Sequence, residues 1–203
     1  MTKSKRKPGR PASIDTQTAM QAVVELFRSK GFAAVSLDDL SDATGLSRPS
    51  LYRSFGNKLS MYIGAMDAFG MQVAETAVPA LNAKGDLETA LTEFFEAMLS
   101  IYYRDSDIAP GCLVFGTAPS SADETEIQSR LKFGIEQLDG LMRARILKAV
   151  PNTPPASLEA AVSISSNTLI AFSARAKSGA TKTDLAEMGA RSAKVISSML
   201  AIA

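Results

Sequence analysis

A run of arginine, serine and tyrosine residues early in the chain has the composition of a surface that reads DNA. Leu51 and Phe55 lie four positions apart in this run, so they would share one face of a helix. Arginine pairs bidentately with O6 and N7 of guanine, and hydroxyl groups donate to base edges or phosphates. The run therefore predicts a short helix that enters the DNA major groove. The side chains expected to point outward are those of Arg48, Ser50, Tyr52, Arg53 and Ser54.

The outward residues of this helix are assigned separate roles. Arg48, at the start of the helix, is the first candidate for base readout. Ser50 is expected to contact a base edge or a phosphate, and Arg53 fits either role. The alternative for each arginine is a position at the solvent edge without a DNA contact.

Two helices and a tight turn must position these side chains, and residues 36–58 contain the signals for both. Ser36 is a good N-cap for the first helix, and Asp39 follows it at capping-box spacing. Gly45 supplies the positive φ that ends this helix. Ser47 caps the second helix, whose first turn holds Pro49. Residues 36–58 thus predict a helix-turn-helix.

The rest of the chain predicts further helices, without a strand pattern or an internal repeat. Hydrophobic periodicity and capping signals indicate a helix before the helix-turn-helix, at residues 16–30, and one after it, at 58–81. We expect an all-α protein of about nine helices with three parts: a disordered basic arm (1–13), a helix-turn-helix DNA-binding domain (14–57), and an effector-binding and dimerisation domain (58–203). The later helices are expected at about residues 86–103, 110–115, 123–150, 156–177 and 182–202.

Residues 22–59 resemble the DNA-binding domain of the TetR family of bacterial transcriptional repressors. The resemblance implies a homodimeric repressor that binds a palindromic operator on double-stranded DNA and is released by a small-molecule effector. It also implies that the Tyr52 hydroxyl and Lys58 contact phosphates, and Ser36 and Ser47 are further candidates for the DNA-binding surface. The matching residues are Leu26, Phe27, Gly31, Phe32, Ser36, Leu40, Gly45, Leu46, Ser47, Ser50, Leu51, Tyr52, Phe55, Lys58 and Leu59.

The last two expected helices carry small and apolar residues that suit close helix packing. In the family these helices form a four-helix bundle with those of a second subunit; the alternative is ordinary core packing within one subunit. The candidate dimer-interface residues are Ile164, Thr168, Phe172, Met188, Ser192, Val195 and Met199.

Aromatic and apolar residues of the body are candidates for an effector pocket, although each also fits a plain core position. Cys112 follows Pro-Gly at an expected helix start, where the helix dipole lowers a thiol pKa. A second hypothesis is therefore a repressor that responds to electrophiles or oxidants through Cys112. The candidate pocket residues are Phe94, Phe95, Met98, Tyr102, Cys112, Phe115, Phe133 and Asn167, with Thr117 and Met142 as further candidates.

Charge is distributed unevenly along the chain. Residues 1–60 have a net charge of +5, and residues 61–203 have a net charge of −4. A basic N-terminal part on an acidic body is typical of a nucleic-acid-binding domain. Arg10, in the basic arm, is the candidate for insertion into the minor groove; the alternative is a solubilising tail.

Several classes of protein are disfavoured by composition. The chain has no histidine, which excludes Ser-His-Asp catalysis and His-based metal sites, and its single cysteine excludes an internal disulfide. We expect no enzyme activity, no cofactor, no metal and no membrane association, and a cytoplasmic location. The acidic residues Asp38, Asp39 and Asp42 are interpreted as capping and surface charge. The rival functions are a helical ligand carrier and a DNA architectural protein without a ligand.

Overall fold

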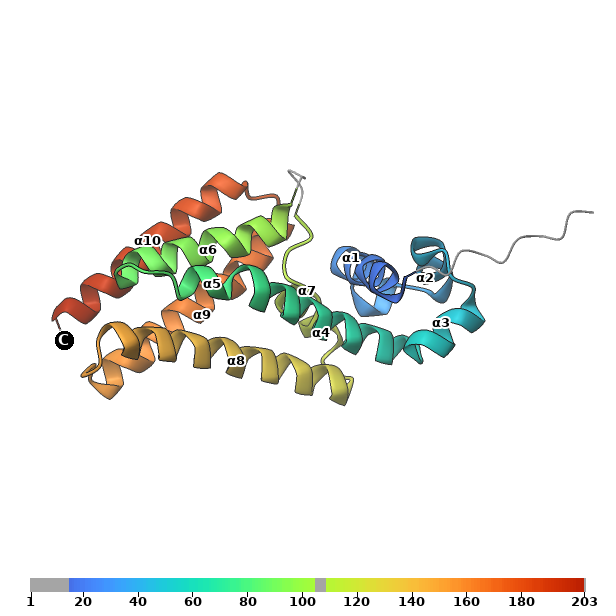
Figure 1. Ribbon diagram of the computed structural model, residues 1–203, viewed down its shortest axis with the longest axis horizontal. Helices are drawn as coiled ribbons and strands as arrows, with labels where there is room; N and C mark the ends of the chain where they lie inside the picture. The colour runs from blue at the N-terminus through green and yellow to red at the C-terminus, as the bar shows by residue number, and fades with distance from the viewer. Residues whose placement is uncertain (1–14, 105–108, 203) are drawn as a thin grey trace, which may run out of the picture.

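The computed structural model describes residues 15–104 and 109–202, and in these residues all regular structure is helical (Figure 1). The expectation of an all-α fold is confirmed. The elements are α1 (Thr16–Ala34), α2 (Leu37–Thr44), α3 (Arg48–Phe55), α4 (Lys58–Thr76), α5 (Val78–Leu81), α6 (Leu87–Tyr103), α7 (Leu113–Thr117), a 3₁₀ turn (Ala118–Ser121), α8 (Thr125–Ala149), α9 (Pro155–Lys177) and α10 (Lys182–Ile202).

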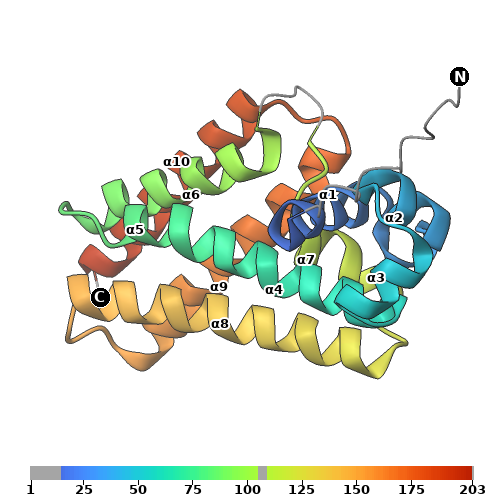
Figure 2. The ribbon, with the colours of Figure 1, turned by 45° about the vertical axis from the view of Figure 1, so that its right-hand side comes forward.

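The first three helices form a head at one end of an elongated molecule (Figures 1 and 2). Each of α1, α2 and α3 contributes at least one completely buried apolar residue to the core of the head, among them Phe27, Leu40 and Leu51. Helix α4 starts next to α3, packs against α1, and continues into the body. The head and the body are thus joined by one continuous helix.

The body is a bundle in which α10 packs against α6 and α9, and α9 packs against α8. Phe95 of α6 meets Phe172 of α9 edge to face, with ring centroids 5.7 Å apart. Gly189 of α10 lies against both rings, and a Cβ at this position would be 3.1 Å from atoms of Phe95 and Phe172. The absence of a side chain at Gly189 therefore allows α10 to approach the body closely.

The helix boundaries follow the sequence expectation in one case and differ in another. The backbone leaves the helical conformation at Gly31 (φ 78°, ψ 171°), where the first helix was expected to close, and a short helical segment after this kink extends α1 to Ala34. The expected single helix 58–81 is divided into α4 and α5 near Pro79, whose ring lacks the amide proton that would continue the α4 ladder. This division accounts for ten α-helices in the described residues instead of about nine.

A buried arginine fixes the connection between α5 and α6. Arg145 of α8 is 5% exposed, and its Nε donates to the carbonyl oxygen of Leu81 at 2.9 Å. Its Nη2 donates to the carbonyl oxygens of Gly85 and Asp86 at 3.3 and 3.1 Å. The turn after α5 is thus held by a charged donor from a helix about 60 residues later in the chain.

Candidate nucleic-acid interface and body cavity

The helix-turn-helix is built by local caps, as its sequence predicts. The Ser36 hydroxyl accepts from the Asp39 amide at 3.1 Å, and the Asp39 carboxylate accepts from the Ser36 amide at 2.8 Å, which completes the capping box. Gly45 ends α2 with φ 68°, and the Ser47 hydroxyl accepts from the Ser50 amide at the start of α3. These contacts fix both ends of α2 and the start of α3.

Helix α3 presents a polar face to solvent while Leu51 holds it to the head. Leu51 is completely buried, and Phe55 is partly buried on the same side. Tyr52 is 48% exposed, and Arg48 and Arg53 are also exposed. Ser50 is partly buried, and its hydroxyl lies 3.0 Å from that of Ser47. The candidates Arg48, Tyr52 and Arg53 therefore share one accessible surface, on which Ser47 and Ser50 form the N-terminal edge.

Arg48 has an intramolecular partner that the sequence did not reveal. Its Nε donates to Asp38 Oδ1 at 2.9 Å, and its Nη2 also contacts this oxygen. Both side chains are largely exposed, at 55% and 69%. The Asp38 carboxylate raises the pKa of Arg48, which stays charged. Asp38, interpreted above as surface charge, thus forms an ion pair with the guanidinium that is expected to contact a base. Ten residues and a turn separate the two, so no helical spacing links them.

The residues beside α3 that are expected to contact DNA phosphates also have partners within the chain. The Lys30 ammonium, 2.5 Å from Asp39, and the Ser36 hydroxyl hold the pKa of Asp39 well below its usual range. Lys58, at the start of α4, lies over the Phe32 ring at 4.7 Å and donates weakly to the Ala33 carbonyl oxygen. Partial burial lowers the pKa of Lys58. Arg10 lies outside the described residues.

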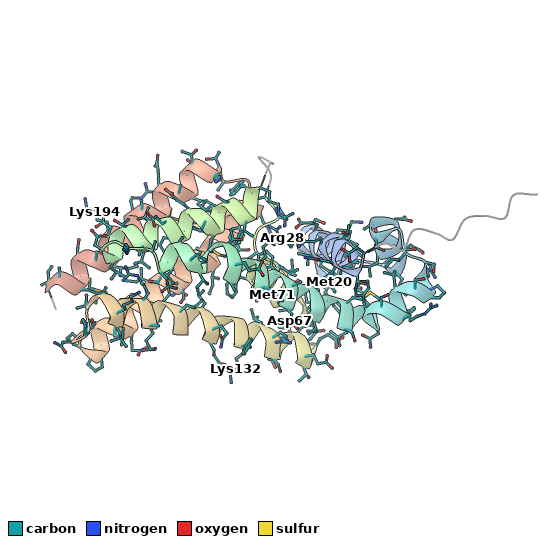
Figure 3. The ribbon with its side chains drawn as sticks, viewed as in Figure 1. Met20, Arg28, Asp67, Met71, Lys132 and Lys194 are labelled. Carbon is teal, nitrogen blue, oxygen red and sulfur yellow. The ribbon has the colours of Figure 1, made fainter. Side chains whose placement is uncertain are left out.

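The head is attached to the body through Arg28, which sequence reasoning did not identify. Arg28 of α1 is completely buried, and it donates to the carbonyl oxygens of Gly111, Ile101 and Tyr102 at 2.9 to 3.3 Å. Its Nη1 also pairs with the Glu25 carboxylate at 3.0 Å. Figure 3 shows Arg28 where α1 meets the body. The only sequence signal was an arginine directly after the apolar residue Phe27 in a mostly apolar helix.

A second contact between head and body lies near α7. The Tyr62 hydroxyl of α4 is 2.6 Å from the Thr117 hydroxyl at the end of α7. The Tyr62 ring packs against Phe27 and Phe32 of the head, with centroids 5.0 and 5.2 Å apart. Tyr62 therefore contacts both the end of α7 and the aromatic residues of α1.

The body contains a cavity of about 590 Å³ between α4, α6, α7 and α8. Five of the candidate pocket residues line it: Phe94, Met98, Cys112, Phe115 and Phe133. The sequence-based pocket candidates included no residue of α4, although Met66, Phe69 and Met71 of this helix line the cavity. The cavity size is in the range of ordinary small-molecule sites.

Five other candidates do not line this cavity, and the structure corrects their assignment. Phe95 packs against Phe172, and Tyr102, Thr117 and Met142 are buried elsewhere in the core. Asn167 is exposed on α9. Helical periodicity identifies which residues face inward, but it does not distinguish residues around a cavity from residues that fill the core.

Cys112 caps the start of α7, where its Sγ accepts from the Phe115 amide at 3.4 Å. The thiol is nevertheless buried, and this burial raises its pKa although the Phe115 amide acts in the opposite direction. The expectation that the helix start lowers this pKa is therefore wrong. Desolvation of the thiolate outweighs the effect of a helix of only five residues.

The candidate dimer residues divide into buried and accessible groups. Phe172 is completely buried against Phe95, so its assignment to the interface is corrected. Thr168 is 7% exposed and donates to the Ser192 hydroxyl at 3.2 Å within the same chain. Helix α9 contacts other helices on several sides, so its apolar residues do not indicate a single outer face. The accessible or partly accessible candidates are Ile164, Met188, Ser192, Val195 and Met199.

Residues 15–104 and 109–202 contain neither a metal-ion cluster nor a membrane-spanning helix. No group of three or more His, Cys, Asp or Glu side chains in these residues is placed to hold a metal ion. None of the helices described there is both long and apolar enough to span a membrane.

Comparison with protein families gives a match in the head. Residues 19–64 match the family described as "Bacterial regulatory proteins, tetR family". The transcriptional repressor ComR of Escherichia coli (strain K12) is 29% identical over 130 residues, which cover 63% of this chain and 61% of ComR. The repressor BdcR of the same organism is 31% identical over 115 residues, covering 55% of this chain and 56% of BdcR. The chain thus aligns with less than two thirds of each relative.

Similar solved structures extend the likeness to the body. A cysteine mutant of the regulator CifR, complexed with a 26-base-pair operator, has a TM-score of 0.77 and is 23% identical, covering 92% of this chain and 98% of that one. A regulator from Chloroflexus aurantiacus has a TM-score of 0.73 and is 20% identical, covering 90% and 96%. At these identities the likeness establishes a shared fold of head and body.

Proposed function

The chain belongs to the TetR family of bacterial regulatory proteins, and from this premise we propose that it is a sequence-specific transcriptional repressor released from DNA by a small molecule. The observation that carries the proposal is the exposed polar face of α3. Two arginines and a tyrosine lie on this face, and Leu51 on the opposite side anchors the helix in the core of the head. Such a surface suits the major groove. Binding to the chromosome would place the protein in the cytoplasm.

A homodimer is part of the proposal, because one head offers few base contacts. Two copies related by a two-fold axis would present two α3 helices to successive half-sites of a palindromic operator. Helices α9 and α10 are the proposed interface, with Val195 and Met199 among the accessible apolar residues. We propose no catalytic role, since the relatives named above are transcriptional repressors.

The position of the cavity supports the proposed release by an effector. The cavity is lined by α4, which carries the head, and by Cys112 and α7, which lie beside the Arg28 and Tyr62 contacts. A small molecule that favours a different arrangement of these helices would change the distance between the two α3 helices of a dimer. Such a ligand lowers DNA affinity only if it binds the released arrangement more tightly.

Selection of genomic fragments by the purified protein tests the proposal. We expect enrichment of a short palindromic sequence, protected in a footprint by the parent protein and lost when Arg48 and Tyr52 are both changed to Ala. Loss of an arginine–guanine pair should cost about 1–3 kcal/mol at one base pair. Unchanged protection by the double variant would contradict the role of α3.

A salt titration of DNA binding by the purified protein distinguishes a repressor from a helical ligand carrier. A repressor should bind random duplex DNA weakly, with an affinity that falls steeply as salt increases. A carrier should show no salt-dependent binding at any concentration tested. A DNA architectural protein would bind random and selected duplexes equally well.

A further inference from the structure

The lining of the body cavity changes from buried at its deep end to exposed at its mouth. Phe94, Met98 and Leu169 at the deep end are at most 4% exposed. Met71 and Phe133 are 64% and 50% exposed, so a ligand would enter past them. Figure 3 shows Met71 and Asp67 on α4 in the region facing α8. The cavity therefore opens between α4 and α8.

Two charged residues, one from each helix, meet at this mouth. Arg130 Nη2 of α8 lies 2.8 Å from Asp67 Oδ2 of α4, and the Arg130 guanidinium lies 5.8 Å from the Phe133 ring centroid. They are the only charged side chains among the lining residues in the described part of the chain, and they neutralise each other. A charged ligand group would enter the apolar interior without a counter-charge, which is costly.

The surfaces that remain for a ligand are aromatic rings and thioethers. Aromatic side chains favour stacked or edge-to-face partners, and methionine sulfur makes favourable contacts with aromatic rings. Gln137, on α8, is the uncharged polar residue of the lining that offers both a donor and an acceptor. We propose that the cavity binds an uncharged aromatic molecule whose hydrogen-bonding group lies at the mouth, beside Gln137, while the Asp67–Arg130 pair leaves no free counter-charge for an anion. This inference rests on the proposed function only for the consequence on DNA binding.

Two fluorescent probes with the same rings test the charge preference. N-phenyl-1-naphthylamine is uncharged, and 8-anilino-1-naphthalenesulfonate adds one sulfonate to the same anilinonaphthalene skeleton. We expect the dissociation constant of the uncharged probe to be at least tenfold lower. Equal or tighter binding of the sulfonate would overturn the proposal and would indicate an anionic ligand that takes Arg130 from Asp67.

A pair of glycine substitutions tests the location. Gly70 of α4 lines the cavity and Gly140 of α8 does not, and a Cβ built at either position would meet no atom within 4 Å apart from the adjacent residues and the nearby backbone of its own helix. Gly70→Leu should fill the cavity and weaken binding of the uncharged probe at least tenfold, whereas Gly140→Leu should bind it like the parent. Parent-like binding by Gly70→Leu, with a circular dichroism spectrum that shows intact helices, would place the ligand elsewhere.

A second pair tests the role of the ion pair at the mouth. Asp67→Asn removes the partner of Arg130, and Glu136→Gln removes the acid of the Lys132–Glu136 pair on α8, outside the cavity. Asp67→Asn should tighten sulfonate binding at least threefold and leave the uncharged probe within twofold, and Glu136→Gln should change neither. No gain for the sulfonate in Asp67→Asn would show that the pair does not exclude anions.

A titration with the selected operator separates this inference from the proposed function. The uncharged probe should release the parent protein from DNA and should not release Gly70→Leu. Probe binding without DNA release would refute the regulatory consequence, and the ligand class would still stand on the two probe experiments. A protein that binds the probe and no DNA would refute the proposed function alone.

Discussion

Arg48 has two competing partners in the proposed mechanism, namely the Asp38 carboxylate and a DNA base. The ion pair is exposed at both ends, so its net stabilisation is small. A bidentate contact with guanine is worth more than this pair, so DNA would displace Asp38. The pair nevertheless holds the guanidinium near the start of α3 in the absence of DNA, and a contact with a base must offset the loss of this pair.

Asp38→Asn tests this competition. We expect a dissociation constant for the selected operator up to about fivefold lower than in the parent, because Arg48 no longer has to leave a carboxylate. Fluorescence anisotropy with a labelled duplex measures the change. Asp42→Asn removes the same charge from the same exposed surface and is the control. An equal gain in both variants would indicate a general charge effect.

The Cys112 thiol is expected to react slowly. Burial raises the pKa of the Cys112 thiol, so a smaller fraction of it is thiolate at pH 7.5 than in an unfolded chain. The rate of alkylation of Cys112 in the folded protein should therefore rise only at more alkaline pH. Iodoacetamide labelling followed by mass spectrometry should show modification of the native protein at least tenfold more slowly than of protein unfolded in urea. Equal rates would restore the hypothesis of a reactive sensor thiol.

At the scale of elements, the contact between α1 and the end of α6 depends on Arg28. Helix α1 carries the core of the head, and the carbonyl oxygens that Arg28 binds belong to α6 and to the segment before α7. Cavity-lining Cys112 directly follows Gly111, one of these acceptors. A ligand that moves this segment would thus displace a carbonyl oxygen that binds Arg28, because the acceptor Gly111 is adjacent in sequence to the cavity-lining Cys112.

Arg28→Met should weaken this attachment while it keeps most of the side-chain volume. Loss of the donors leaves buried carbonyl oxygens without this partner, so we expect the free energy of unfolding to fall by about 1–3 kcal/mol. Urea denaturation followed by circular dichroism measures it. Arg53→Met, on the exposed face of α3, should stay within about 0.5 kcal/mol of the parent. Parent-like stability of Arg28→Met would show that the head is held by other contacts.

At the scale of the whole molecule, the proposed dimer determines whether two heads reach one operator. Val195, on α10, is 57% exposed in the single chain, and Met188 and Met199 on the same helix are partly exposed. Burial of such residues against a second copy would remove apolar surface from water. The separation of the two α3 helices would then depend on the α9–α10 interface.

Val195→Arg should prevent this association. We expect a monomer by sedimentation velocity at micromolar concentration, and at least a tenfold loss of affinity for a duplex with both half-sites, because each head would bind alone. Leu147→Arg places the same charge on a partly exposed leucine of α8, outside the proposed interface, and should remain dimeric. A dimeric Val195→Arg variant would place the interface on another face.

The helices of the head follow from sequence because their signals are local. The Ser36–Asp39 capping box, the left-handed Gly45 and the Ser47 cap lie within a few residues of the backbone groups they satisfy. Hydrophobic periodicity likewise reports which side of a helix faces inward, and this was enough to predict an all-α fold. The expected helix 58–81 was instead extended past Pro79, and the structure divides it before this residue.

Only the tertiary structure shows which residues far apart in the sequence contact one another. Arg28 and Arg145 are buried because carbonyl oxygens about 60 to 80 residues away accept from them, and neither has a sequence signature. The same holds for the Asp67–Arg130 pair and for the division of apolar residues between the cavity and the core. Caps and periodicity depend on residues within one or two helical turns, whereas burial and pairing depend on how whole helices pack, which no short stretch of sequence encodes.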